Sequence, residues 1–145
     1  MKFVYESEIA ASAERVFAFH ERPDAFALLL PPWQRVEVIT PPSSLAVGTR
    51  VELRMRLFGV WVDYEAEHVA YEPGRMFADV QLKGPFHSWL HTHVVSPTGA
   101  HSCKLSDQIE LELRGGLLGR IGEPVARRQL AKLFAHRHAI TRREA

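Results

Sequence analysis

The segment from Arg50 to Glu67 constrains the fold most, because it predicts a β-hairpin with a single register. Apolar and charged residues alternate before the dipeptide Phe58-Gly59, as they do in a strand with one buried face. A two-residue turn at this dipeptide would place Leu53 opposite Tyr64. The same register predicts further neighbours: Leu57 with Val60, Met55 with Val62, Val51 with Ala66, Arg54 with Asp63, and Arg50 with Glu67. Apolar and charged pairs therefore predict the same hairpin.

Similar patterns predict the other elements of the chain. Strands are expected at residues 2–9, 33–40, 75–82, 87–95 and 102–113. Between the first two strands we expect a short helix capped by Ser12 and a second one after Pro23-Asp24. A C-terminal amphipathic helix is expected to carry Leu117, Leu118 and Ile121, to be interrupted near Gly122 and Pro124, and to continue to Ile140.

These elements predict an α+β fold in which an antiparallel meander is covered by the last helix. The meander has one apolar face, and the C-terminal segment is the only long amphipathic element that could cover it. A strongly bent sheet around a single helix can leave space that side chains do not fill. We therefore expect an apolar cavity, although the periodicity leaves open whether side chains close it.

Length and composition limit the classes of function. A chain of 145 residues predicts a single domain, residues 1–145, with one core. Lys and Arg total 18 against 17 Asp and Glu, a net charge of +1, so we do not expect a nucleic-acid partner. The longest apolar stretch, Ala25 to Pro32, is far shorter than the roughly 20 residues that span a bilayer, so we expect no stable membrane insertion. Cys103 is the only cysteine and no signal peptide is recognisable, which favours a cytoplasmic protein. Clustered arginines after residue 126 are interpreted as a solvated helix face.

The chain also carries a string of residues typical of one superfamily. The string comprises Leu30-Pro31-Pro32-Trp33, Phe77-x-x-x-Gln81-x-x-Gly84-Pro85-Phe86-x-x-Trp89-x-His91-x-His93, Asp107, Gly116 and Phe134-x-x-Arg137. It resembles the bacterial ligand-binding subgroup of the START-like superfamily, which is also called polyketide cyclase/dehydrase-like or birch-pollen-allergen-like. The order of elements resembles that superfamily along nearly the whole chain.

The resemblance implies the helix-grip fold, with a curved seven-stranded antiparallel sheet wrapped around the last helix. It also implies a cavity for a lipid, polyketide, quinone or sterol-like compound. The sequence departs from the subgroup at residues 110–115, which read Glu-Leu-Glu-Leu-Arg-Gly where an aromatic residue and a proline are usual. We therefore expect a different cavity mouth.

Polar residues on the predicted apolar face are the most unusual feature. Trp89, His91 and His93 share one face of their strand, and hairpin pairing can bring His91 near Asp107. The group could be a satisfied hydrogen-bonded core, or it could be the polar end of a ligand pocket. A metal site of His91, His93 and Asp107 is a weaker interpretation because no fourth ligand is evident. In a catalytic interpretation, His91 and Asp107 form a general-base pair, without a nucleophile.

The sequence thus predicts a protein that binds a hydrophobic small molecule without a cofactor, as a monomer or homodimer, and leaves open whether it also transports that molecule. The expected ligand-binding residues are Leu53, Met55, Val62, Tyr64, Phe77, Trp89, His91, His93, Leu105, Asp107, Ile121, Val125 and Leu133. The alternatives are a cyclase or dehydratase that uses His91 and Asp107, and an interaction module whose interior is filled by side chains.

Overall fold

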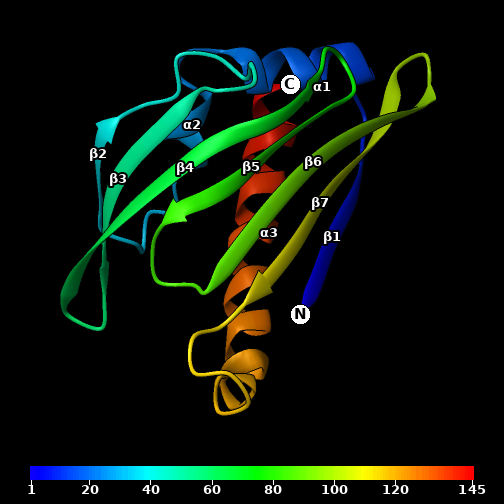
Figure 1. The fold of residues 1–145 in the computed structure, drawn as a ribbon. Coiled ribbons are helices and arrows are strands. Elements are labelled where there is room, and N and C mark those ends of the chain that lie inside the picture. The colour runs from blue at the N-terminus through cyan, green and yellow to red at the C-terminus, as the bar shows by residue number, and fades with distance from the viewer.

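The computed structural model describes residues 1–145, which form one sheet, two short helices and one long helix (Figure 1). The strands are β1 (Lys2–Ile9), β2 (Val36–Thr40), β3 (Arg50–Leu57), β4 (Val60–Glu72), β5 (Met76–Lys83), β6 (Ser88–Gly99) and β7 (Ser102–Glu112). The helices are α1 (Ala13–Glu21), α2 (Ala25–Leu29), a 3₁₀ helix η1 (Gly119–Gly122) and α3 (Glu123–Glu144). This is the helix-grip arrangement that the sequence predicted.

The seven strands follow the order β1-β7-β6-β5-β4-β3-β2, and all neighbours are antiparallel. The β3–β4 register is the predicted one, with Leu53 opposite Tyr64. Phe58 and Gly59 both have a positive φ, 51° and 81°, as a type I′ turn requires. The predicted hairpin is therefore confirmed.

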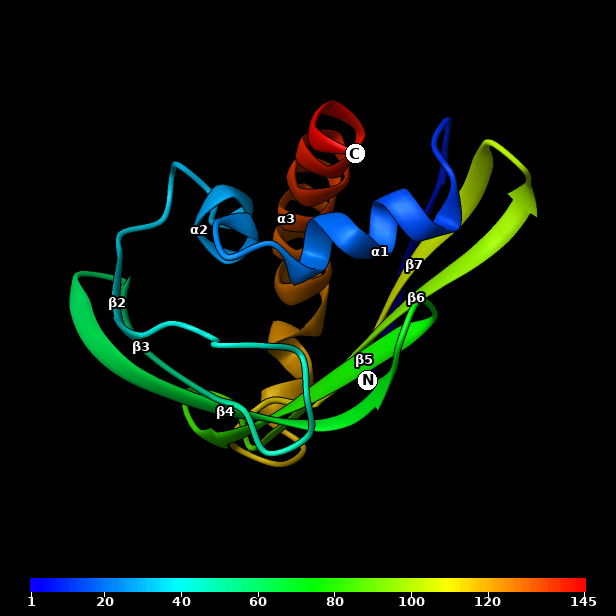
Figure 2. The same cartoon turned by 90° about the horizontal axis from the view of Figure 1, so that it is seen from above.

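The sheet curves into a trough that holds α3, while α1 and α2 lie across its open side (Figure 2). Ser12 caps α1, as predicted: its Oγ accepts a hydrogen bond from the backbone N–H of Arg15 at 3.2 Å. The apolar face of α1 is buried through Val16, Phe17 and Phe19. Both short helices thus cover part of the open side of the trough.

Helix α3 faces the sheet with a stripe of side chains spaced by helical turns. The buried residues are Leu130, Phe134, His138 and Thr141. Pro124 lies in the first turn, where its missing N–H costs no hydrogen bond. The prediction that Leu117, Leu118 and Ile121 form part of the amphipathic helix is wrong. They precede α3 beyond the end of the sheet and are 76–79% exposed, because nothing there covers them (Figure 1).

Two separate apolar clusters hold the helices to the sheet. One lies under α1 and includes Ile9, Val16, Phe17, Val95 and Leu105. The other lies under α3 and consists of Phe3, Ile109, Leu111, Leu130 and Phe134. The inner face of the sheet beside these clusters carries polar side chains and borders a cavity. None of the helices is long and apolar enough to cross a membrane.

Candidate functional site

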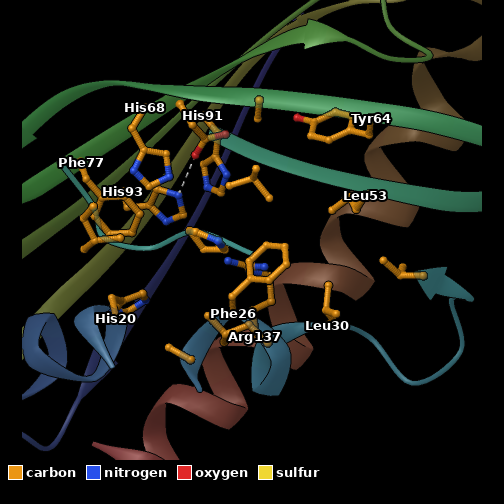
Figure 3. A pocket seen from close by; sticks show the side chains of 18 of the residues that line it. His20, Phe26, Leu30, Leu53, Tyr64, His68, Phe77, His91, His93 and Arg137 are labelled. Carbon is orange, nitrogen blue, oxygen red and sulfur yellow. Dashed lines mark ion pairs between the residues drawn. The ribbon is translucent and has the colours of Figure 1, made fainter. Parts of the chain in front are cut away.

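A cavity of about 300 Å³ lies between the inner face of the sheet and the helices (Figure 3). The apolar part of its wall includes Phe26, Leu29, Leu30, Val36, Leu53, Met55 and Leu133. The polar part includes His20, Tyr64, His68, Asp79, His91, His93 and Arg137. The sheet therefore does not close completely against α3, which was the point that the sequence left open.

The structure brings most of the predicted ligand-binding residues to this wall. Those that line it are Leu53, Met55, Tyr64, Phe77, Trp89, His91, His93 and Leu133. They come from β3, β4, β5, β6 and α3, so residues far apart in the sequence converge on one space. The alternation of side chains along each strand accounts for the strand residues of this set.

The other predicted residues do not line the cavity. Val62 lies two residues from the start of β4, near the hairpin turn. Leu105 packs in the cluster under α1. Asp107 is 3% exposed, because the histidines bonded to it cover it. Ile121 and Val125 are 76% and 58% exposed, because η1 and the first turn of α3 extend beyond the sheet.

Strand pairing gathers the polar residues of the wall. In one row, His68 of β4, Asp79 of β5 and His91 of β6 lie side by side on neighbouring strands. In the adjoining row, Phe77 of β5, His93 of β6 and Asp107 of β7 lie side by side in the same way. The predicted proximity of His91 to Asp107 is confirmed by a hydrogen bond, although His93 is the residue directly opposite Asp107. The imidazole of His93 also stacks on the Phe77 ring, with centroids 3.9 Å apart.

Asp107 is the centre of a buried hydrogen-bond network. Its Oδ1 accepts a hydrogen bond from His91 Nε2 at 2.7 Å, and its Oδ2 accepts one from His138 Nε2 at 2.6 Å. His138 Nδ1 lies 2.7 Å from Ser7 Oγ, which extends the network to β1. His93 Nδ1 is 2.9 Å from Asp107 Oδ1, but its direction is wrong for a hydrogen bond and it has no other partner. One carboxylate thus orients side chains of β6 and α3.

These contacts set opposite charge preferences within the cluster. Burial alone would raise the pKa of Asp107, but His138, His91 and His93 hold it well below its usual value. Burial and the neighbouring His93 lower the pKa of His91. The pKa of His93 is raised despite burial, because Asp107 and Asp79 both face it. Asp79 Oδ2 lies 3.4 Å from His93 Nε2, and its pKa is lowered by that contact despite burial (Figure 3). The surroundings therefore favour the ionised forms of Asp79 and Asp107. They favour the protonated form of His93 and the neutral form of His91.

Four further polar residues belong to the site or its network. The sequence analysis overlooked His20, His68 and His138, and its interpretation of the arginines after residue 126 as a solvated helix face is wrong for Arg137, which lines the cavity. His68 follows Tyr64 on the same face of β4, so the alternation that revealed Tyr64 could have revealed it. His138 lies on the buried stripe of α3, where helical spacing could have revealed it. His20 and Arg137 reach the cavity from α1 and α3, and their convergence depends on how the helices pack. No local pattern predicts that packing.

Asp79, His91 and His93 are the residues that could hold a metal ion. Each offers one ligand atom, and these atoms all lie within 4.8 Å of one another. The predicted set contained Asp107, whereas the set in the structure contains Asp79. The carboxylate of Asp107 instead accepts hydrogen bonds from His91 and His138. Arg137 lines the same cavity, and its positive charge opposes a bound cation.

The arrangement can orient a polar group or transfer a proton. His91 uses Nε2 for Asp107, so Nδ1 is the nitrogen that remains for a ligand. Burial and the charge of Asp79 raise the pKa of Tyr64, which keeps its hydroxyl protonated and able to donate. Polar groups at one end and aliphatic groups at the other are typical of a small-molecule pocket.

The curved sheet, the long helix in its trough and the internal cavity define a START-like protein of the helix-grip class. The chain belongs to the family described as polyketide cyclase / dehydrase and lipid transport, whose model matches residues 1–142. No curated protein matches the sequence significantly.

Solved structures show the same fold at low sequence identity. The protein TTHA0849 from Thermus thermophilus is 16% identical with a TM-score of 0.76, over 99% of this chain and 96% of that one. Norcoclaurine synthase from Thalictrum flavum, in complex with dopamine and hydroxybenzaldehyde, is 22% identical with a TM-score of 0.71, over 97% and 84%. The Zhui aromatase/cyclase from Streptomyces sp. R1128 is 17% identical with a TM-score of 0.66, over 99% and 90%. These likenesses concern the fold.

Proposed function

We propose that this protein binds a hydrophobic small molecule in the cavity between the sheet and α3. The observation that carries the proposal is the open interior of about 300 Å³, apolar over much of its wall and polar at one end. Leu53, Met55 and Leu133 would contact the apolar body of the ligand, and His91 with Tyr64 would contact its polar group. The family, which includes lipid transport, supports a hydrophobic ligand.

The size of the cavity favours a compact ligand. Small-molecule pockets typically enclose about 300–1,000 Å³, and this cavity lies at the lower end of that range. If a ligand buried about 300 Å² of apolar surface, transfer from water would contribute about 7 kcal/mol, from which association subtracts several kcal/mol. Apolar contact alone would therefore bind weakly, and the polar end would supply much of the remaining affinity.

The role of the polar end is tested by replacing His91 with alanine. We expect His91→Ala to weaken binding of 2-naphthol several-fold, because one hydrogen bond contributes about 0.5–1.5 kcal/mol. Binding of naphthalene, which has the same apolar body and no hydroxyl, should change little. Isothermal titration calorimetry with both compounds measures the difference.

The matched control is His101→Ala, which removes an exposed histidine from the β6–β7 turn. This variant should bind both compounds as the unmodified protein does. Equal losses of naphthol and naphthalene affinity in His91→Ala would show that His91 only supports the packing of the wall.

Catalysis by a cyclase or dehydratase is the second candidate function. It is favoured by the neutral His91 held by the Asp107 carboxylate, since such a pair can accept a proton from an activated carbon acid. A carrier returns its ligand unchanged, whereas an enzyme converts it. Mass spectrometry of a poly-β-ketone substrate incubated with the protein and with His91→Ala separates these candidates: conversion that requires His91 supports the enzyme, and unchanged compound supports the carrier.

A further inference from the structure

Arg137 is a cation in the wall of a mostly apolar cavity. It lies on α3, one turn after Phe134, and its side chain is directed from the helix towards the sheet (Figure 3). The guanidinium carbon is 5.6 Å from the centroid of the Phe134 ring. The acidic side chains of the sheet that act on this group, Asp79 and Asp107, are too far from it to form an ion pair.

The guanidinium of Arg137 has no protein partner. No carboxylate oxygen lies within 4.0 Å of it, and it donates no hydrogen bond to a protein acceptor. The other two partly buried arginines both have ion pairs, Arg22 with Asp24 and Glu144, and Arg54 with Glu37 and Asp63. The remaining arginines without a partner are all exposed: Arg15, Arg35, Arg56, Arg120, Arg127 and Arg128. Arg137 alone is both enclosed and unpaired.

An unpaired guanidinium in this position is costly unless an anion joins it. Burial lowers the pKa of Arg137, while the more distant charges of Asp107 and Asp79 act in the opposite direction. Those two carboxylates are already in contact with imidazoles, Asp107 with His91 and Asp79 with His93. The donors of Arg137 are therefore available to a molecule in the cavity, and their planar fork matches a carboxylate.

We infer that the ligand of this cavity is an amphipathic organic carboxylate whose anionic group binds Arg137. This inference rests on the proposed function and makes it more specific. The apolar body would lie against Leu53 and Met55 of β3 and against Leu30, which directly follows α2. Two parallel N–H···O hydrogen bonds from Arg137 would hold the carboxylate.

The inference is tested with naphthalene-2-carboxylate and its primary amide, which share one apolar body and differ in charge. The unmodified protein should bind the carboxylate roughly 10- to 100-fold more tightly, the range for hydrogen bonds between charged groups. In Arg137→Met, which keeps an unbranched apolar side chain but no charge, the preference should disappear and the amide should bind as before. Calorimetric titration at neutral pH measures both affinities.

Two further variants keep the result interpretable. Arg128→Met removes an exposed arginine from the same helix and should keep the full preference for the carboxylate. Arg137→Lys keeps the charge without the fork and should keep part of the preference, which also tests the site if Arg137→Met does not fold. Equal binding of both compounds by the unmodified protein, or an undiminished preference in Arg137→Met, would overturn the inference and leave the proposed function standing. If the folded protein bound neither compound, both would fall.

Discussion

Asp107 is the residue on which the geometry of the polar end depends. It connects His91 of β6 to His138 of α3 while being almost fully buried itself. A buried carboxylate is stable only when hydrogen bonds and opposite charge replace its hydration. The histidines provide both, and in return the carboxylate fixes the orientation of the His91 ring. The side chains that stabilise the buried carboxylate thus include His91, which we propose to contact the ligand.

The buried imidazole of His20 should make the folded protein less stable in acid. Burial, together with the charge of His93, lowers its pKa to about 4, and its Nδ1–H donates to the Val16 carbonyl at 2.8 Å. Below pH 6.5 the unfolded chain therefore takes up a proton that the folded chain takes up only near pH 4. The free energy of unfolding should fall over this window, by roughly 3 kcal/mol from His20 alone.

Urea unfolding between pH 7 and 4 checks this, with His20→Leu as the comparison. The variant should lose stability less steeply with acidification, by up to about 1 kcal/mol per pH unit. His91, with its lowered pKa, acts in the same direction in both proteins, and His93, with its raised pKa, acts in the opposite direction. Parallel stability curves for the two proteins would mean that His20 does not titrate in this way.

At the scale of elements, the β3–β4 hairpin offers a test of local strain. Phe58 has a φ of 51°, a region that disfavours most side chains, and its ring is 97% exposed, so packing does not offset this cost. Phe58→Asn should raise the free energy of unfolding by roughly 0.5–1 kcal/mol, because Asn-Gly suits this turn. Thermal unfolding followed by circular dichroism measures the change. Phe58→Ala, which removes the ring without favouring positive φ, should not stabilise; a gain equal to that of Phe58→Asn would refute the argument.

Elements with strong local patterns were predicted correctly, and those fixed by distant contacts were not. The register between Leu53 and Tyr64 follows from alternation and turn chemistry, which lie within one hairpin. Ile121 and Val125 were expected in the cavity because they look amphipathic, but the sheet ends before it reaches them. Arg137 reaches the site through the packing angle of α3, which no local spacing specifies. The sequence therefore predicted the fold and the strand side of the site better than its helical side.

At the scale of the whole molecule, the cavity exists because the interior is packed as three separate apolar clusters, including a third one of Phe19, Ala25 and Leu29 in α1 and α2, rather than as one core. The cluster under α1 and the cluster under α3 each close part of the trough. Beside them lie polar side chains of β4, β5 and β6, which cannot simply collapse onto apolar neighbours because packing against such neighbours would leave their polar atoms unpaired. The curvature of the sheet and the polarity of its inner face together leave space for a small-molecule ligand.

The central claim, that a hydrophobic guest occupies this space, is tested most directly by filling it. Ala66 of β4 is 4% exposed and lines the cavity, so Ala66→Phe would place a ring where the guest is expected. Calorimetric titration of 2-naphthol into the unmodified protein and into folded Ala66→Phe is the decisive measurement. We predict saturable binding at one site by the former and at least about tenfold weaker binding by the latter. Equal affinity in both proteins, or no binding by the unmodified protein, would contradict the claim.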